Sequence, residues 1–255
     1  MVANPIHDAI NLHDHSAISK ILKADSDQVT VVNEVGESPL HRAVWEGSLD
    51  IVALLIDAGG DINAPGPNGD TPLHYAAHED RPSEIAELLI QRGADIERKN
   101  KRGETPLIVA AMRGNDEAAN VILSHGASVD LDSAALLGKV DRVRMFLKED
   151  SHLHQLDRPG LLLDLIVRRG QKEIAELLLE RGLNPNTGRP SILTAIEMAL
   201  NDPTTDVGMI RLLLAHGADV NQPAIKSRVH SMVGRFNNPG MSKVLAVLKE
   251  YGFAK

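Results

Sequence analysis

The chain has 255 residues, of which 43% are hydrophobic and only 2% aromatic, so its core must be built from small aliphatic side chains packed in thin layers. It contains no cysteine, which excludes disulfides and thiolate metal sites. A formal net charge of −8 argues against nucleic acid as a partner, and no apolar run in the sequence is long enough to span a membrane.

The first segment, residues 1–32, opens with PIHDAIN and has no basic start followed by an apolar stretch, so no secretory signal is visible. A related pattern then recurs at a near-constant interval. SPLHRAV begins at Ser38, TPLHYAA at Thr71 and TPLIVAA at Thr105. Each copy follows a glycine and leads into an apolar run that ends at another glycine.

Each copy predicts two short helices joined by a turn. The Ser or Thr can accept a hydrogen bond from a free backbone N–H of the first turn, and Pro suits the first helical position because its missing N–H is not needed there. The closing Gly adopts the left-handed conformation that ends the second helix. Helices this short are unstable alone, so the pairs must stack on their neighbours.

The pattern weakens but continues in the second half, with TAIEMAL at Thr194 and RLLLAHGADVN at Arg211. We therefore divide the chain into about eight helix-turn-helix units. Their ranges are 1–32, 33–65, 66–99, 100–130, 131–156, 157–188, 189–222 and 223–255.

Three connections depart from the pattern. Between Gly126 and Gly138 the chain enters the next helix directly, so one projecting loop is expected to be missing near residue 131. The gap either changes the curvature of the array or is a harmless shortening, and the sequence leaves both open. Longer turns with a Pro occur at residues 78–83 and 201–206; they either reach toward a partner or are neutral variations in length.

TPLHYAA followed by ELLIQRGADIE resembles the ankyrin repeat family. The resemblance is strong from about residue 33 to residue 130, good from about 161 to 221, and weak elsewhere. It implies an all-α ankyrin-repeat solenoid of helix-turn-helix units with short β-hairpin loops.

The charges suggest how the array is divided. Residues 33–97 carry 13 acidic and 3 basic side chains, whereas residues 98–255 carry 18 acidic and 22 basic ones. We expect residues 1–130 to form N-terminal, acidic repeats. Residues 131–255 are expected to form degenerate, mildly basic repeats that are continuous with the first array.

The histidines do not form a reactive group. The resemblance implies that His7, His41 and His74 bond the backbone of an adjoining loop. The His-x-His pairs at 13/15 and 152/154 point to different helix faces and lack a third ligand. No catalytic or phosphate-binding motif is present. We expect no enzyme activity, no metal and no cofactor.

The resemblance further implies that partner contacts come from the loop tips and from the exposed face of each first helix. The only tryptophan falls on that face, and Trp and Arg are enriched at interface hot spots. Charge along this face changes from acidic to basic, which favours a partner of graded opposite charge; the alternative is a merely soluble surface. The candidate contact residues are Glu34, Glu37, Asn68, Asp70, Lys101 and Arg102 in the loops, and Trp45, Glu46, His78, Glu79, Met112, Arg113, Arg168 and Arg169 on the helices.

The sequence thus predicts a protein-protein interaction module, an adaptor or scaffold that acts as a cytoplasmic monomer. It is expected to bind one partner protein through the loop tips and the concave helix face, and to bind neither nucleic acid nor membrane. Two alternatives use the same surface. One is a regulator or inhibitor that covers a partner enzyme or toxin, and the other is a host-directed bacterial effector.

Overall fold

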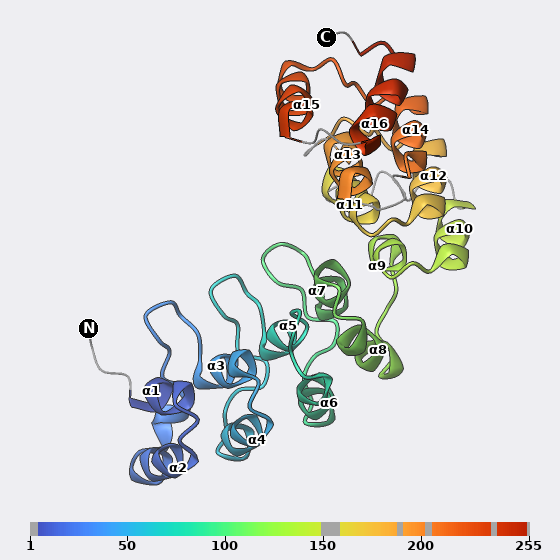
Figure 1. Ribbon diagram of the computed structural model, residues 1–255. Helices are drawn as coiled ribbons and strands as arrows, with labels where there is room; N and C mark the ends of the chain where they lie inside the picture. Colours follow the sequence, from blue (N-terminus) through green and yellow to red (C-terminus); the bar gives the residue numbers. More distant parts are fainter. Residues whose placement is uncertain (1–4, 149–158, 188–190, 202–205, 236–238, 254–255) are drawn as a thin grey trace. The chain divides into compact units, whose positions relative to one another are not determined.

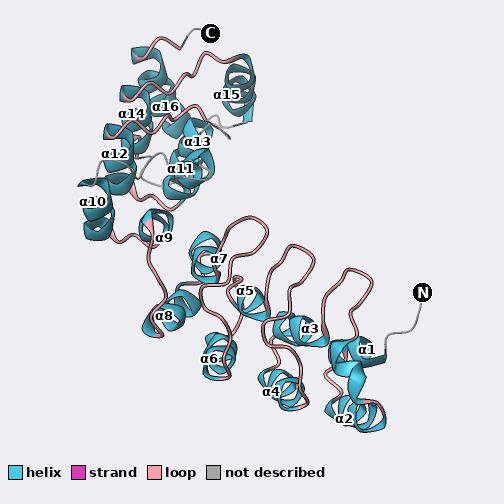
Figure 2. Ribbon diagram, turned by 180° about the vertical axis from the view of Figure 1, so that it is seen from behind, coloured by secondary structure: helices cyan, strands magenta, loops and turns pink. Residues whose placement is uncertain are grey.

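The computed structural model describes residues 5–148, 159–187, 191–201, 206–235 and 239–253 (Figure 1). Within these residues the chain forms α-helices, one short 3-10 helix, turns and loops, and no strand is formed (Figure 2). The α-helices of the described residues follow one another as eight pairs in the order of the predicted units, so the all-α repeat architecture is confirmed. In unit order the helices are α1 (Pro5–Asn11), α2 (His15–Ala24), η1 (Ser26–Thr30), α3 (Pro39–Glu46), α4 (Leu49–Asp57), α5 (Pro72–Ala76), α6 (Ser83–Gln91), α7 (Pro106–Arg113), α8 (Asp116–Ser124), α9 (Leu131–Leu136), α10 (Val140–Lys148), α11 (Pro159–Arg168), α12 (Lys172–Glu180), α13 (Ser191–Asn201), α14 (Gly208–Ala215), α15 (Pro223–Arg235) and α16 (Pro239–Glu250).

The chain divides into two compact units, Met1–Val129 and Asp130–Lys255. The division falls at the shortened connection expected near residue 131. That the two arrays are continuous with one another stays a prediction. Of the segments singled out in the sequence, residues 152–154 and 202–205 lie outside the described residues.

In the first unit the helices stack in two rows. The first helices α1, α3, α5 and α7 pack one on the next, and the second helices α4, α6 and α8 form the other row. Both views place the first helices between the second helices and the long loops (Figures 1 and 2). The position after each Pro at the start of a first helix supplies a core residue, and Ile6, Leu40 and Leu73 are fully or almost fully buried there.

Helix starts and ends follow the predicted pattern. The Ser38 hydroxyl accepts a hydrogen bond from the His41 N–H, and the Thr105 hydroxyl accepts one from the Ile108 N–H, so both cap the first helices that follow them. Gly47 ends α3 with φ +74°, a left-handed conformation that favours glycine.

The histidines of the first helices are structural, as the resemblance implied. His41 Nε2 donates to the carbonyl oxygen of Asp70 at 3.0 Å, and His74 Nε2 donates to that of Glu104 at 3.0 Å. His7 Nε2 makes the same contact with the Val31 carbonyl at 2.8 Å. His41 and His74 therefore fasten one unit to the loop that begins the next, whereas His7 bonds a residue near the end of its own unit.

The projecting loops turn without forming strands in the described residues. Asn100 illustrates the reason, because its side-chain oxygen accepts the N–H groups of Arg102 and Glu104 that a hairpin would pair with backbone. One backbone bond, from the Asn100 N–H to the Glu104 carbonyl, closes the base of the turn. The β-hairpin expected in this loop is thus a turn held by a side chain.

The missing loop is confirmed. The connections from α4 to α5 and from α6 to α7 run over residues 58–71 and 92–105, whereas α8 and α9 are joined by residues 125–130 alone. Asp130 then caps α9 directly, because its side chain accepts the Ser133 N–H at 2.8 Å.

In the second unit α9, α11 and α13 form one row and α10, α12 and α14 form the other, with α15 and α16 packed on α13. The same inter-repeat bond recurs in both units. Asn186 donates to the Gly217 carbonyl at 2.8 Å and accepts from the Asp219 N–H at 2.8 Å. Asn63 makes the equivalent pair in the first unit, with Gly93 and Asp95. The second unit is therefore built from the same repeats, despite its weaker sequence match.

Candidate partner-binding surface

The aromatic cluster consists of Trp45 on α3, Tyr75 on α5 and His78 just after α5. The Trp45 ring centroid lies 5.6 Å from that of His78 and 6.1 Å from that of Tyr75, both in edge-to-face geometry. Such pairs add stabilisation beyond the apolar area that they bury. Trp45 remains 38% exposed, so this cluster offers a large apolar ring to solvent.

The long turn between α5 and α6 folds back on this cluster. The guanidinium of Arg81 lies 4.7 Å from the Trp45 ring centroid, and its Nη1 donates to the Trp45 carbonyl oxygen. The turn includes Asp80, whose φ of +62° lies in the left-handed region. From the next repeat, Asn115 donates to the His78 carbonyl at 2.8 Å. The inserted residues therefore build the cluster.

Charged side chains of both signs lie near the cluster. Burial lowers the pKa of His78, and the nearby Arg113 and Arg81 lower it further, so the imidazole is neutral at neutral pH. Arg113 is exposed and has no ion-pair partner among the described residues. On the other side, the Tyr75 hydroxyl donates to Glu37 Oε1 at 2.8 Å, and burial with this bond raises the pKa of the phenol. The cluster thus lies between the Glu37 carboxylate, which is hydrogen-bonded to Tyr75, and the Arg113 guanidinium, which has no ion-pair partner among the described residues.

Two acidic loop candidates hold the repeats together. Asp70 is 7% exposed, and its carboxylate accepts from Asn100 Nδ2 at 2.6 Å and lies 3.5 Å from Arg102 Nη2. Glu37 is half-buried and accepts from Asn33 as well as from Tyr75. Both side chains reach the loop or helix of a neighbouring repeat, because the stacked loops bring these groups within hydrogen-bonding distance.

The other loop candidates are exposed. Glu34 and Asn68 lie at the tips of their loops, while the Lys101 ammonium donates to the Pro67 carbonyl at 2.8 Å. Arg102 is bonded to Glu104 at 2.7 Å, so this cation is already paired within its own loop.

The helix candidates of the first unit lie at or just after the C-terminal ends of α3, α5 and α7, and we call this set the first-helix face. Glu46 on this face is paired with Arg42 one turn earlier, whereas Glu79 is exposed and Met112 is half-buried. The members of the first-helix face are Trp45, Glu46, His78, Glu79, Met112 and Arg113.

The two candidates in the second unit are engaged within it. Arg168 lies 3.2 Å from the buried carboxylate of Asp164, one helical turn away, and Arg169 donates to the Leu136 carbonyl of α9. The structure therefore brings Trp45, His78 and Arg113 together within the first unit and describes Arg168 and Arg169 as a separate pair.

Three contributors to this surface were missed by sequence reasoning. Tyr75, Arg81 and Asn115 act through contacts with other repeats, which repeat spacing alone does not reveal. A signal existed for Arg81, because the inserted turn carries it close in sequence to the aromatic positions. Among the described residues, no three His, Asp or Glu side chains gather as a metal site would require.

Comparisons with known proteins agree with this architecture. Residues 63–133 match the family described as ankyrin repeats (3 copies), and residues 28–76 match the family described as ankyrin repeats (many copies). No helix in the described part of the chain is both long and apolar enough to cross a membrane.

Several curated proteins are similar to the chain. It is 28% identical over 242 residues to the B-cell lymphoma 3 protein homolog of Mus musculus, which covers 91% of the chain and 41% of that protein. It is 31% identical over 190 residues to the tyrosine-protein kinase Shark of Drosophila melanogaster, with coverage of 74% and 18%. It is 35% identical over 80 residues to the NF-kappa-B inhibitor cactus of the same fly, with coverage of 29% and 16%. The chain therefore spans less than half the length of each of these relatives.

Proposed function

Because the chain is a member of the ankyrin repeat family by its matches over residues 28–133, we propose that it is an adaptor. It holds one partner protein on the first-helix face and the adjoining loop tips. As part of this proposal the chain catalyses nothing and acts as a cytoplasmic monomer. The observation that supports the site best is the exposed aromatic cluster of Trp45, Tyr75 and His78 beside Arg113.

The composition and rigidity of the cluster favour binding. Trp, Tyr and Arg are enriched at interface hot spots. Trp and Tyr bury a large area and lose little side-chain freedom on binding. Trp45 is already fixed by Tyr75, His78 and Arg81, so little entropy remains to be lost when a partner covers it. Arg113, exposed and without an ion-pair partner in the described part of the chain, supplies a cation for a carboxylate of the partner.

The loop tips add contacts at the edge of this surface. Glu34, Asn68, Lys101 and Arg102 are the exposed members of the loop set. Asp70 and Glu37 shape the loops from within, so we assign them a supporting role. We expect the tips to influence association rate and specificity more than affinity, as exposed rim charges usually do.

A second candidate function is that of a regulator that covers a working surface of its partner. Its support is the likeness of 80 residues to the NF-kappa-B inhibitor cactus, a protein whose name states an inhibitory role. Both functions use the same face, and they differ in whether the partner loses activity when bound. Mixing purified chain with the captured partner and measuring the partner's own activity separates them.

The test of the binding face is affinity capture from cell extract followed by mass spectrometry. The site variant combines Trp45→Ala with Arg113→Glu. The matched control combines Met145→Ala with Arg142→Glu on α10, which removes another exposed large apolar side chain and reverses another exposed Arg. We expect a specific partner to be captured at least about tenfold less by the site variant and equally by the control.

Circular dichroism melting of each variant shows that the change in capture does not come from unfolding. If the folded site variant captures the same proteins in the same amounts as the wild-type chain, the first-helix face is not the binding surface.

A further inference from the structure

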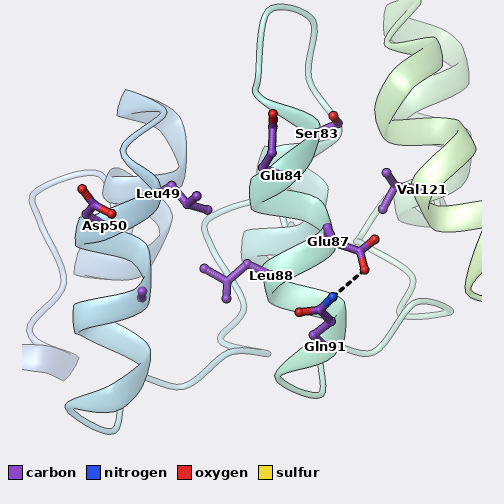
Figure 3. A pocket seen from close by; sticks show the side chains of 9 residues that line it. Leu49, Asp50, Ser83, Glu84, Glu87, Leu88, Gln91 and Val121 are labelled. Carbon is purple, nitrogen blue, oxygen red and sulfur yellow. Dashed lines mark hydrogen bonds between the residues drawn. The ribbon is translucent and has the colours of Figure 1, made fainter.

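A groove crosses the second helices of the first unit, in the row opposite the loops. It has a volume of about 520 Å³ and is lined by α4, α6 and one residue of α8. Figure 3 shows Leu49 and Leu88 pointing toward each other across the space between α4 and α6, with Val121 beyond. The groove belongs to neither the aromatic cluster nor the loop tips.

The chain's own repeats show that this groove is unusual. At the first position of the second helix, α4 has Leu49, where α6, α8 and α12 begin with Ser83, Asp116 and Lys172. Leu49 is 40% exposed there.

One turn further along, α4 has the small Ala53, where α6 and α12 have Glu87 and Glu176. Among α4, α6 and α12, only α4 therefore has a small apolar residue at this position, where the other two have a polar one. The substitution leaves an open, apolar floor where α6 and α12 present a carboxylate.

The rim of this groove is acidic. Asp50 and Glu84 lie on the rim, both exposed and without an ion-pair partner among the described residues. Glu87 lies beside them and is bonded to Gln91 and His125. The nine lining residues include no Lys or Arg, and the surrounding residues 33–97 have 13 acidic and 3 basic side chains. An apolar segment that enters with positive charges is favoured at this rim.

The dimensions suit a short helix. The residues that α6 contributes run from Ser83 to Gln91, which corresponds to about 12 Å, or about two helical turns. An amphipathic helix laid in a groove of this kind presents anchors one turn apart, and flanking cations then reach both edges.

We propose that this groove is a second docking site, which takes an amphipathic helical segment of a partner protein with Leu- or Met-type anchors and flanking Lys or Arg. The apolar floor of Leu49, Ala53 and Leu88 binds the anchors, and Asp50 and Glu84 bind the cations. This site is independent of the first-helix face, so the chain can hold two proteins at once and bring them together.

The test uses a fluorescent helical peptide of about 15 residues with Leu on one face and Lys on the other. Ala53→Glu gives α4 the residue that α6 and α12 carry at this position, so it closes the floor without disturbing the core. We expect this variant to weaken peptide binding at least about tenfold, measured by fluorescence anisotropy. Asp50→Lys with Glu84→Lys should weaken it as well.

The control reverses two exposed carboxylates elsewhere, Glu176→Lys with Glu180→Lys on α12, and should leave binding unchanged. A peptide with Glu in place of Lys should not bind. Equal weakening by the α12 control, or full binding by Ala53→Glu, would show general charge attraction and overturn the proposal. Sedimentation of the chain without peptide tests whether the groove binds a second copy of the chain. A dimer that Ala53→Glu dissociates would assign the groove to that contact and would also overturn the proposal.

These variants do not change the first-helix face. The outcome of the capture experiment with Trp45→Ala and Arg113→Glu is therefore independent of the outcome of the peptide-binding experiment. Loss of peptide binding in Ala53→Glu with unchanged capture at the first-helix face is the result expected for two distinct sites.

Discussion

At the scale of single residues, the imidazoles of the first helices are held in the neutral state. His41 and His74 are fully buried. In each ring Nδ1 accepts a backbone N–H, and the Nε2–H donates to a carbonyl oxygen. A second proton on the ring would remove the acceptor and place a charge in the core. Burial accordingly lowers the pKa of both groups below the ordinary value of 6.5.

This arrangement predicts that acid destabilises the first unit. Because the folded pKa lies below the unfolded value, the stabilisation is complete above pH 6.5 and is lost as the pH falls below it. Each such histidine contributes a slope of at most about 1.4 kcal/mol per pH unit. His74→Ile, which copies Ile108 of the next repeat, should reduce the slope in urea unfolding between pH 7 and pH 5. A slope equal to that of the wild-type chain would contradict the prediction.

Single residues also show which features could be predicted from the sequence. The histidine role was predictable because it belongs to the repeat, and so were the caps at Ser38 and Thr105. Asp70 was expected at a loop tip available to a partner, and the structure places it inside the loop stack with Asn100. The sequence shows that a carboxylate is present at position 70. Whether a residue of the next repeat hydrogen-bonds to it depends on the distance between the stacked loops, which the sequence does not give.

At the scale of elements, the turn between α5 and α6 depends on a neighbouring helix. Asn115 caps α8 through its side-chain oxygen, which accepts the Ala118 N–H at 3.0 Å. Its amide nitrogen donates to the His78 carbonyl at the start of the turn. One residue therefore begins a helix in one repeat and fixes the inserted turn of the repeat before it.

Two variants separate these roles. Asn115→Ser keeps a capping hydroxyl but cannot reach His78, so we expect a loss of about 1 kcal/mol in the free energy of unfolding. Asn115→Ala loses the cap too, which adds about 1 kcal/mol more. Chemical denaturation measures both. If Ser and Ala destabilise equally, the cap contributes nothing at this position.

Helix order, pairing and the missing loop near residue 131 could be predicted from spacing, because each unit repeats the same local code. The inserted turn at 78–83 could not be placed, since its length says nothing about the direction in which it folds. Its position depends on Arg81 reaching Trp45 and on Asn115 reaching His78, which are contacts between repeats.

At the scale of the whole molecule, the chain consists of two compact units, and the boundary lies at the short connection after α8. The core of the first unit is formed from its own residues, with Ile6, Leu40, Leu73 and Leu89 among its buried members. Repeat arrays gain stability from interfaces between neighbours, so a unit with intact neighbours is expected to fold alone.

We expect a fragment of residues 1–129 to be helical and to unfold cooperatively, as followed by circular dichroism on heating. A fragment of residues 1–113 ends after α7 and removes its partner α8, so it should melt at a lower temperature. A 1–129 fragment without a cooperative transition would show that the first unit depends on the second.

The contacts of Trp45 have a practical optical consequence. The chain has a single indole, and its ring lies against Tyr75, His78 and the guanidinium of Arg81. Tryptophan fluorescence responds to water and to nearby charged groups, and all tryptophan emission of the chain comes from this one position. A spectroscopist can therefore watch the long turn lift away, or a ligand settle there, in an unlabelled sample.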